Sequence, residues 1–287
     1  MDIGPLDQPV LIFGGPYNNL EATQALLKHA KTLGIPPERM ICTGDVVAYC
    51  ADPEATTDLI ASSGINVVLG NCEESLSADS EDCGCGFAEG SICDALSVQW
   101  YAHARQNLTA TSKRWMASLP RYIELEMTER RLTVVHGAPS AINRYIFEST
   151  EDSVVTGELQ QNDSDGVLCG HSGLPFTRVV EGKLWHNAGV VGFPANDGTP
   201  RVWFSTLTPA GRQIVIDHHA LDYDHVRAAR KMRERGLPEA YAATLKSGIW
   251  DNCEILPPVE TARQGQPLSE HTQAWSGVQN IATAAAE

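Results

Sequence analysis

Four polar residues each come directly after a short apolar run, and this repeated pattern most constrains the fold. In chain order they are Asp45, Asn71, His136 and His171. Short apolar runs bounded by glycine are typical of buried strands. Function gathers where strands end at the carboxyl edge of an open α/β sheet, so residues there can converge on one ion. The sequence therefore predicts an α/β fold with a metal site at the edge of its sheet.

The first 70 residues alternate strand-like runs with helix-like repeats. We expect strands at residues 9–13, 40–43 and 66–69, with helices at 20–33 and 52–62 between them. This βαβαβ order favours parallel strands joined by right-handed crossovers. Residues 91–119 are helical in pattern and continue the α/β alternation.

The second half consists mainly of short strand-like runs separated by turns. The expected strands are 122–127, 131–135, 167–169, 178–181, 183–186, 201–208 and 213–219. Short runs joined by tight turns are typical of antiparallel or mixed sheets. Together the two halves predict two mixed sheets flanked by helices.

The end of the chain changes character after these strands. We expect a catalytic domain over residues 1–224 and a helical appendage over 225–263, with helices at 225–236 and 239–247. Residues 264–287 are polar and weakly patterned, so we expect a flexible tail there.

Net charge and hydropathy exclude several partners. A formal net charge of −15 provides no basic stripe for nucleic acid, so we expect a small phosphorylated or anionic substrate instead. The sequence contains no apolar run of the roughly 18 residues that a membrane span requires, and it does not begin with a signal-peptide pattern. We therefore expect a cytoplasmic protein without membrane contact. A homo-oligomer remains open.

The motif order Gly-Asp, Gly-Asn-x-Glu, His-Gly and Gly-His resembles the calcineurin-like metallophosphoesterase superfamily. Residues 64–139 and 170–194 look most like its small bacterial phosphodiesterase branch, and the resemblance covers about residues 9–223. It implies a four-layer α/β/β/α sandwich of two mixed sheets, with two metals at one edge.

The resemblance also implies a ligand set. Asp45 would bridge two metals, and Asn71, His136 and His171 would complete the second metal position. A carboxylate, an amide oxygen and imidazoles suit manganese, iron or zinc better than calcium, which prefers oxygen alone.

The ligands for the other metal position are missing. Gly15 stands where the family has an aspartate, Tyr17 where it has a histidine, and Gly173 in place of the second histidine of Gly-His-x-His. All three losses affect the ion of this other position. We therefore expect one divalent transition metal per chain, bound by Asp45, Asn71, His136 and His171, and no ion at the other position. An alternative is that Tyr17 and His186 restore the second ion. The simpler interpretation makes Tyr17 a pocket-lining phenol and His186 a hydrogen-bonded neighbour of the site.

Other residues are candidates for binding and catalysis. The glycine-containing turn with Gly15, Asn18 and Asn19 could hold an anion on its backbone N–H groups, or could be a plain strand-to-helix turn.

Gly173 is a further candidate for the substrate pocket. With one metal, Tyr17, Asn18, His186 and Arg144 could supply the missing stabilisation, although a surface arginine is the commoner case. Cys72 occupies the position at which many relatives have a leaving-group acid, and a thiol is a poorer acid at neutral pH. The neighbouring Glu73 could assist, or could simply fix its loop.

A glycine-rich segment after Asn71 carries four cysteines, Cys72, Cys83, Cys85 and Cys93. Their spacing lacks the Cys-x-x-Cys pairs typical of zinc or iron–sulfur sites. A structural metal is one hypothesis, and a loop that covers the pocket and sets substrate choice is the other. In a reducing compartment we expect thiols.

The function that this resemblance favours is hydrolysis of a small phosphomonoester or phosphodiester, with a single divalent metal and metal-bound hydroxide. One alternative is a repurposed mononuclear enzyme, a hydrolase or lyase, that acts on a non-phosphate substrate. Another is a non-catalytic protein that binds a phosphorylated ligand. The fold alone does not distinguish them.

Overall fold

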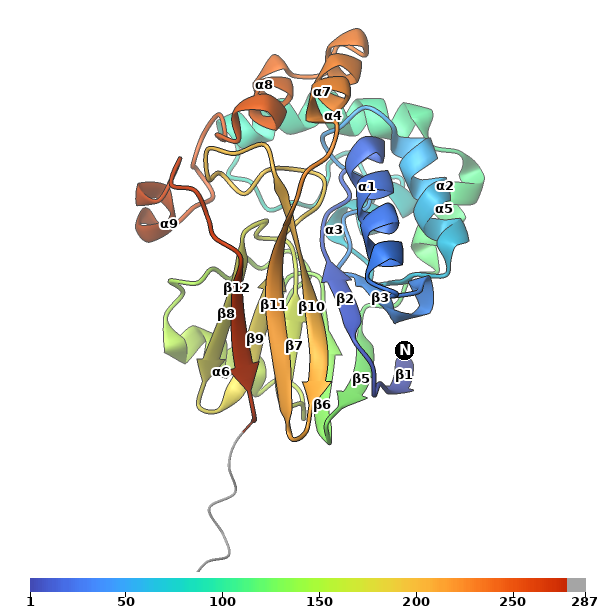
Figure 1. Ribbon diagram of the computed structural model, residues 1–287. Helices are drawn as coiled ribbons and strands as arrows, with labels where there is room; N and C mark the ends of the chain where they lie inside the picture. Colours follow the sequence, from blue (N-terminus) through green and yellow to red (C-terminus); the bar gives the residue numbers. More distant parts are fainter. Residues whose placement is uncertain (278–287) are drawn as a thin grey trace, which may run out of the picture.

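Two six-stranded mixed sheets form the centre of the molecule in this computed structural model, which describes residues 1–277 (Figure 1). The first sheet contains, in spatial order, β1 (Asp2–Pro5), β5 (Ile123–Met127), β6 (Arg130–Val134), β7 (Gly166–Cys169), β9 (Lys183–Ala188) and β8 (Pro175–Val180). The second contains β12 (His271–Trp275), β11 (Gln213–Leu221), β10 (Val202–Ala210), β2 (Val10–Phe13), β3 (Met40–Cys42) and β4 (Asn66–Val67).

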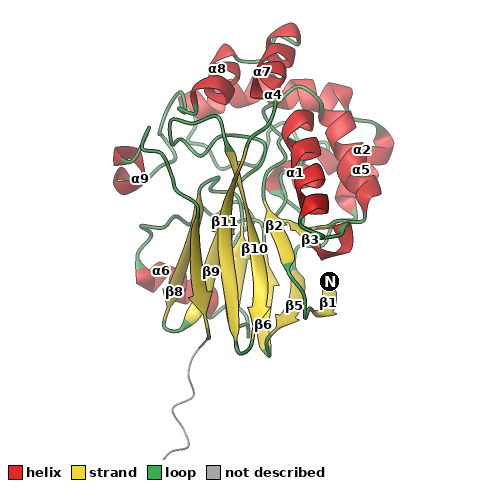
Figure 2. Cartoon of the chain, in the orientation of Figure 1, coloured by secondary structure: helices red, strands yellow, loops and turns green. Residues whose placement is uncertain are grey.

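Helices surround these sheets (Figure 2). Those of the first half are α1 (Leu20–Thr32), the 3-10 helix η1 (Pro37–Arg39), α2 (Pro53–Ser63), α3 (Asn71–Ser77), α4 (Ile92–Asn107) and α5 (Ala110–Ala117). Those of the second half are α6 (Asp152–Leu159), α7 (His225–Glu234), α8 (Glu239–Ser247) and α9 (Pro258–Ala262).

The elements pack as the predicted four-layer sandwich. Between the sheets, Ile12 and Ile41 of the second sheet share a buried core with Leu132 and Leu168 of the first. On the outer face of the second sheet, α1 and α2 bury apolar side chains, and α6 covers the outer face of the first sheet. Removing this apolar surface from water is the main stabilising contribution to such a fold. The predicted fold class is confirmed.

The strands that carry the candidate ligands run in parallel within each sheet. β3 pairs parallel with β2 and β4, as the βαβαβ pattern predicted, and β6 pairs parallel with β7. Asp45 and Asn71 therefore follow neighbouring strands of one sheet, and His136 and His171 follow neighbouring strands of the other. This places the four residues at the edge where the two sheets meet.

The helices after residue 224 pack against the carboxyl edge of the sheets. Helices α7 and α8 lie above the strands in Figure 1, and their buried side chains join one apolar cluster with residues from α4. Lys231 of α7 contacts Glu21 and Asp52 at 2.6 Å each, which ties α7 to α1 and to the start of α2. The separation into a catalytic domain and an appendage stays a prediction, but the appendage contributes to the core.

The expected tail from residue 264 is wrong for one stretch. His271–Trp275 forms strand β12, which pairs antiparallel with β11, and Trp275 is buried between the sheets. Its polar sequence hid this, because alternate residues of an edge strand face solvent. Residues 278–287 of the expected tail lie outside the described residues.

No helix within residues 1–277 has the length and the apolar character needed to cross a bilayer.

We predict that Trp275→Ala strongly destabilises the protein. The indole is 3% exposed, and its Nε1 donates a hydrogen bond to the carbonyl of Gly182 at 3.0 Å. Truncating such a side chain costs about 3–5 kcal/mol of unfolding free energy. Chemical denaturation of the variant measures this, with Ser269→Ala in the exposed part of the same segment as the control. A cost below about 1 kcal/mol would show that the end of the chain contributes no core.

Candidate metal centre

The four predicted ligands converge on one point. The Nε2 atom of His136 lies 3.0 Å from Asn71 Oδ1, 3.2 Å from His171 Nδ1 and 3.2 Å from Asp45 Oδ2. All four side chains are buried. Ligand atoms of Asp45, His136 and His171 lie within 4.8 Å of one another, a spacing that can hold an ion. The predicted convergence is present.

Hydrogen bonds orient His136 and Asn71 so that the lone pairs of their ligand atoms point toward the space between the four side chains. His136 Nδ1 contacts the carbonyl oxygen of Thr43 at 2.6 Å, and a carbonyl only accepts, so Nδ1 carries the proton. In the neutral ring the Nε2 lone pair then faces two oxygen acceptors. Asn71 donates its Nδ2 to the carbonyl of Cys83 at 2.9 Å, which fixes its Oδ1 toward His136. Acceptors that face one another in a buried site need a cation between them, and a metal fits this donor set.

The electrostatics agree with a site for positive charge. Burial raises the pKa of Asp45, but the neighbouring His136 outweighs burial, and the net direction is downward. Burial lowers the pKa of His136, but the Asp45 carboxylate outweighs it, and the net direction is upward. Burial, and then the charge of His136, lower the pKa of His171 to about 3, so this ring stays neutral with a free lone pair.

Glycine and a buried carboxylate shape the loops that carry the ligands. A side chain at Gly70 would collide with the backbone of Asp45, so only glycine permits this approach. Glu73 accepts hydrogen bonds from the backbone N–H groups of Asp45 at 2.8 Å, Val47 at 3.0 Å and Gly70 at 3.2 Å. The simpler sequence interpretation of Glu73 is therefore supported, since it fixes its loop.

Comparison with known proteins agrees with this geometry. Residues 12–209 match the calcineurin-like phosphoesterase superfamily domain. The chain belongs to this superfamily. The family domain contains all four converging residues. Protein MJ0912 of Methanocaldococcus jannaschii is 25% identical over 245 residues, which cover 80% of this chain and 94% of that protein.

Solved structures share the phosphoesterase fold. A metallophosphoesterase from Sphaerobacter thermophilus is similar with a TM-score of 0.67 and 22% identity, over 85% of this chain and all of that one. Protein PH1004 from Pyrococcus horikoshii OT3 is similar with a TM-score of 0.70 and 16% identity, over 87% of this chain and all of that one. At these identities the likeness shows the fold alone.

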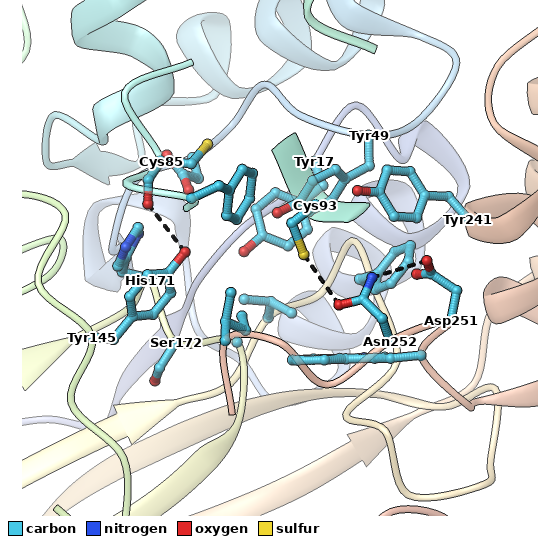
Figure 3. Close-up of a pocket in the computed structure, with 17 residues that line it drawn as sticks. Tyr17, Tyr49, Cys85, Cys93, Tyr145, His171, Ser172, Tyr241, Asp251 and Asn252 are labelled. Carbon is cyan, nitrogen blue, oxygen red and sulfur yellow. Dashed lines mark hydrogen bonds between the residues drawn. The ribbon is translucent and has the colours of Figure 1, made fainter. Parts of the chain in front are cut away.

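The two glycines at which the resemblance expects ligands of the other metal both lie beside aromatic rings. A Cβ atom at Gly15 would lie 2.5–2.8 Å from three ring atoms of Tyr17, so this ring lies directly over Gly15. A Cβ atom at Gly173 would lie 3.5 Å from the six-membered ring of Trp250. Tyr17 and Gly173 both line the cavity beside the metal centre, as expected for pocket residues (Figure 3).

The cavity beside the metal centre has many aromatic side chains in its walls. It contains about 670 Å³ of space free of protein atoms, its open mouth included. Its walls include Asp45 and His171 of the metal centre, and six of its aromatic side chains are Tyr17, Tyr49, Tyr145, Phe193, Tyr241 and Trp250. The ring of Tyr145 lies 4.1 Å from the ring of His171, centre to centre.

Most of the aromatic residues that line the cavity were not predicted from the sequence. Tyr145 directly follows Arg144, and only Arg144 was a candidate because it is charged. Tyr241 and Trp250 lie in the expected appendage, outside the matched family domain. One sequence feature could have indicated a binding site in the segment after α8. Trp250, Asp251 and Asn252, an aromatic and two polar residues, are adjacent there.

The proposed anion-binding turn is contradicted by its hydrogen bonds. The N–H groups of Gly15, Tyr17, Asn18 and Asn19 all donate to backbone carbonyls, so none is free for an anion. The side chain of Asn19 accepts from the N–H of Ala22 and caps α1, while Asn18 donates to the carbonyl of Ala48 at 2.6 Å. The turn is the plain strand-to-helix turn that the sequence also allowed.

Two predicted catalytic side chains lie away from the cavity. Arg144 pairs with the buried carboxylate of Glu158 at 2.7 Å and does not line the cavity. Cys72 is buried in the apolar cluster under the helices, and burial and Asp45 raise its pKa well above the usual value. Neither geometry nor acidity suits Cys72 to protonate a leaving group.

His186 also lies outside the cavity. Its ring points between the sheets, where Nδ1 contacts the hydroxyl of Thr177 at 2.8 Å and the ring centre lies 5.0 Å from that of His218. The neighbouring Asn187 supports the site instead, by donating to the carbonyl of Gly170 and to the hydroxyl of Ser172. The sequence predicted His186 as the hydrogen-bonding neighbour of the site, but the next residue, Asn187, has this position. Successive strand residues face opposite sides of the sheet, so the two side chains point in different directions.

Three of the four clustered cysteines lie together, because Asn71 Nδ2 contacts the sulfur of Cys72 at 3.5 Å and that of Cys85, whereas Cys93 lies apart from them. Cys83 and Cys85 form a disulfide, which differs from the expected thiols, and Cys93 contacts Asn252 Oδ1 at 3.3 Å. The sulfur of Cys85 accepts from Asn71 Nδ2 at 3.4 Å, so this loop touches a candidate ligand. Cys85 and Cys93 line the cavity, which supports the covering-loop hypothesis over a structural metal.

We predict that the buried histidines make the protein less stable in mild acid. Burial, followed by the charge of His271, lowers the pKa of His186 to about 3, below its value in the unfolded chain. The unfolded chain therefore binds more protons, and stability falls as pH drops below about 6.5. At pH 5 the loss is about 2 kcal/mol for this residue. Denaturation of the protein and of His186→Phe at pH 7.5 and 5 checks this. Identical losses in both proteins would contradict it.

Proposed function

We propose that the protein hydrolyses a small phosphodiester with one divalent transition metal, held by Asp45, Asn71, His136 and His171. The observation that carries this proposal is the contact of His136 Nε2 with three other donor atoms in a buried site. Superfamily membership supports phosphoester hydrolysis as the reaction class. Manganese, iron and zinc suit the donor set.

The packing of Tyr17 supports a single ion. Its ring occupies the space into which an aspartate at position 15 would project, since a Cβ atom there would already lie 2.5 Å from the ring. Gly173 offers no donor on the opposite side, where Trp250 lies. Restoration of a second ion by Tyr17 and His186 is not supported, because His186 faces the core between the sheets.

The metal would polarise a phosphoryl oxygen and lower the pKa of water. The residues of the chain supply orientation and hydrogen-bond donors around it. Burial, and then the Asp45 charge, raise the pKa of Tyr17 well above its usual value, so the phenol keeps its proton at neutral pH. Lining the cavity beside Asp45, Tyr17 can donate a hydrogen bond to a phosphoryl or departing oxygen.

The charge of the cavity favours a diester over a monoester. Among the described residues, no lysine or arginine lines it, while Asp45 and Asp251 do. A phosphomonoester carries close to two negative charges at neutral pH, and a single ion would leave it poorly balanced beside two carboxylates. A phosphodiester carries one negative charge and fits a single metal better.

We predict one equivalent of transition metal per chain. Elemental analysis of protein purified without added metal, and again after loading with manganese, measures this number. Tyr17→Phe should leave it unchanged, because the phenol is not a ligand in this proposal. Two equivalents in the wild-type protein, with one lost in Tyr17→Phe, would show a dinuclear centre.

We predict turnover of bis(p-nitrophenyl) phosphate in the presence of manganese, and its loss in Asp45→Ala. Loss of a residue that merely orients a metal ligand costs about 10- to 100-fold, so removal of the ligand itself should cost at least roughly 100-fold. Asp163→Asn removes an exposed carboxylate elsewhere on the surface and is the control. Equal activity of wild type and Asp45→Ala would rule out this centre.

A further inference from the structure

The aromatic walls of the cavity form a cage beside the metal centre. Tyr49 lines the cavity and packs against three other wall residues, with ring distances of 4.8 Å to Tyr17, 5.4 Å to Phe193 and 5.0 Å to Tyr241. Trp250 adds an indole on the side of Gly173. Figure 3 shows Tyr17, Tyr49 and Tyr241 grouped on one side of the cavity, with Asp251 and Asn252 nearby. We call Tyr17, Tyr49, Phe193, Tyr241 and Trp250 the aromatic cage.

Two residues of the cage are held in an unusual backbone conformation. Tyr17 has a φ of 49° and Tyr49 a φ of 23°, both in the region that bulky residues avoid. Such strain costs free energy and persists where the surrounding structure fixes it, commonly at functional sites. The turns that carry these two rings are therefore held in place by the surrounding structure.

The charges around the cage select a cation. Asp45 and Asp251 line the same cavity, and no lysine or arginine among the described residues does. The electron-rich faces of aromatic rings attract cations, most strongly where water is excluded. Asp45 is committed to the proposed metal, so Asp251 is the carboxylate that adds to this attraction and would repel a second anionic group.

Two polar side chains of the cavity are already engaged in hydrogen bonds within the protein. Asn252 already donates to Asp251 and accepts from Cys93 and from the N–H of Glu254. The hydroxyl of Ser172 accepts from Asn187. A base is selected by hydrogen bonds to its edge as well as by stacking, and these two side chains are engaged. An alkylammonium group needs no such partners.

We propose that the aromatic cage binds a quaternary or tertiary ammonium group carried by one alcohol of the phosphodiester substrate. The attached phosphate would lie at the metal centre, which shares Asp45 and His171 with the same cavity. The phosphate half of this proposal rests on the proposed function, and the ammonium half stands on the cage alone. In the reaction, water adds its oxygen to phosphorus and one phosphorus–oxygen ester bond breaks. The departing oxygen takes one proton, and the product is a monoester.

Binding of choline tests the cage without any hydrolysis. Calorimetric titration of the full chain compares choline with 3,3-dimethylbutan-1-ol, which has the same shape without the charge. A cation held by desolvated aromatic rings should bind at least about tenfold more tightly than its neutral counterpart. Equal binding of the two, or no binding of choline, would overturn the proposal.

Matched variants at position 250 separate charge recognition from packing. Trp250 donates to the carbonyl of Pro194 at 2.7 Å, and both Trp250→Phe and Trp250→Leu lose this bond. Only phenylalanine keeps an aromatic face, so choline should bind Trp250→Leu at least about fivefold more weakly than Trp250→Phe. Thermal melting confirms that both fold. Equal affinities would remove Trp250 from the cage.

A second comparison links the cage to the phosphate. The kcat/KM for p-nitrophenyl phosphorylcholine should exceed that for p-nitrophenyl 3,3-dimethylbutyl phosphate by about tenfold, and Asp251→Asn should reduce this ratio. Asp163→Asn is again the control, because its carboxylate lies far out in solvent.

The two proposals fail in different ways. Equal turnover of both esters would leave hydrolysis standing and overturn the cage as a specificity site. Choline binding that depends on the residue at 250, without turnover of either ester, would leave the cage standing and overturn hydrolysis.

Discussion

The metal centre depends on one hydrogen bond between the two sheets, from His136 Nδ1 to the carbonyl of Thr43 at 2.6 Å. His136 follows a strand of the first sheet and Thr43 a strand of the second, so this bond joins their carboxyl edges. It also fixes the proton on Nδ1 and turns the Nε2 lone pair toward Asp45 and Asn71. The same contact therefore links the edges of the two sheets and orients the His136 ring in the candidate metal site.

The glycines at positions where the resemblance expects metal ligands have aromatic neighbours. Gly15 leaves room for the ring of Tyr17, and Gly173 lies in ordinary contact distance of the indole of Trp250. In the single-metal proposal, aromatic rings lie where a second inorganic cation would need charged or imidazole donors. The faces of these rings also attract cations, but they suit a large organic ammonium ion better than a small metal ion. On this interpretation the site keeps a preference for two cations and replaces one metal by an organic group.

The sequence predicted the convergence of Asp45, Asn71, His136 and His171 because these residues follow strands, and parallel strands end at a common edge. Asp45 and His171 could be placed from the apolar runs before them. The cage could not, since Tyr241 and Trp250 reach the cavity through the packing of α7 and α8, which no local pattern encodes. His186 was misplaced because facing is decided by strand register, and strand β12 was missed because its polar residues face solvent.

The separation along the chain has a consequence for specificity. All four candidate ligands lie within residues 12–209, the part that matches the superfamily, whereas Tyr241, Trp250 and Asp251 lie beyond it. The ion pairs of Lys231 with Glu21 and Asp52 hold these later helices against the family domain. Partly buried pairs of this kind fix orientation more than they add stability. Relatives can therefore share the metal ligands and differ in substrate, since Tyr241, Trp250 and Asp251 of the proposed ammonium site come from the segment outside the common domain.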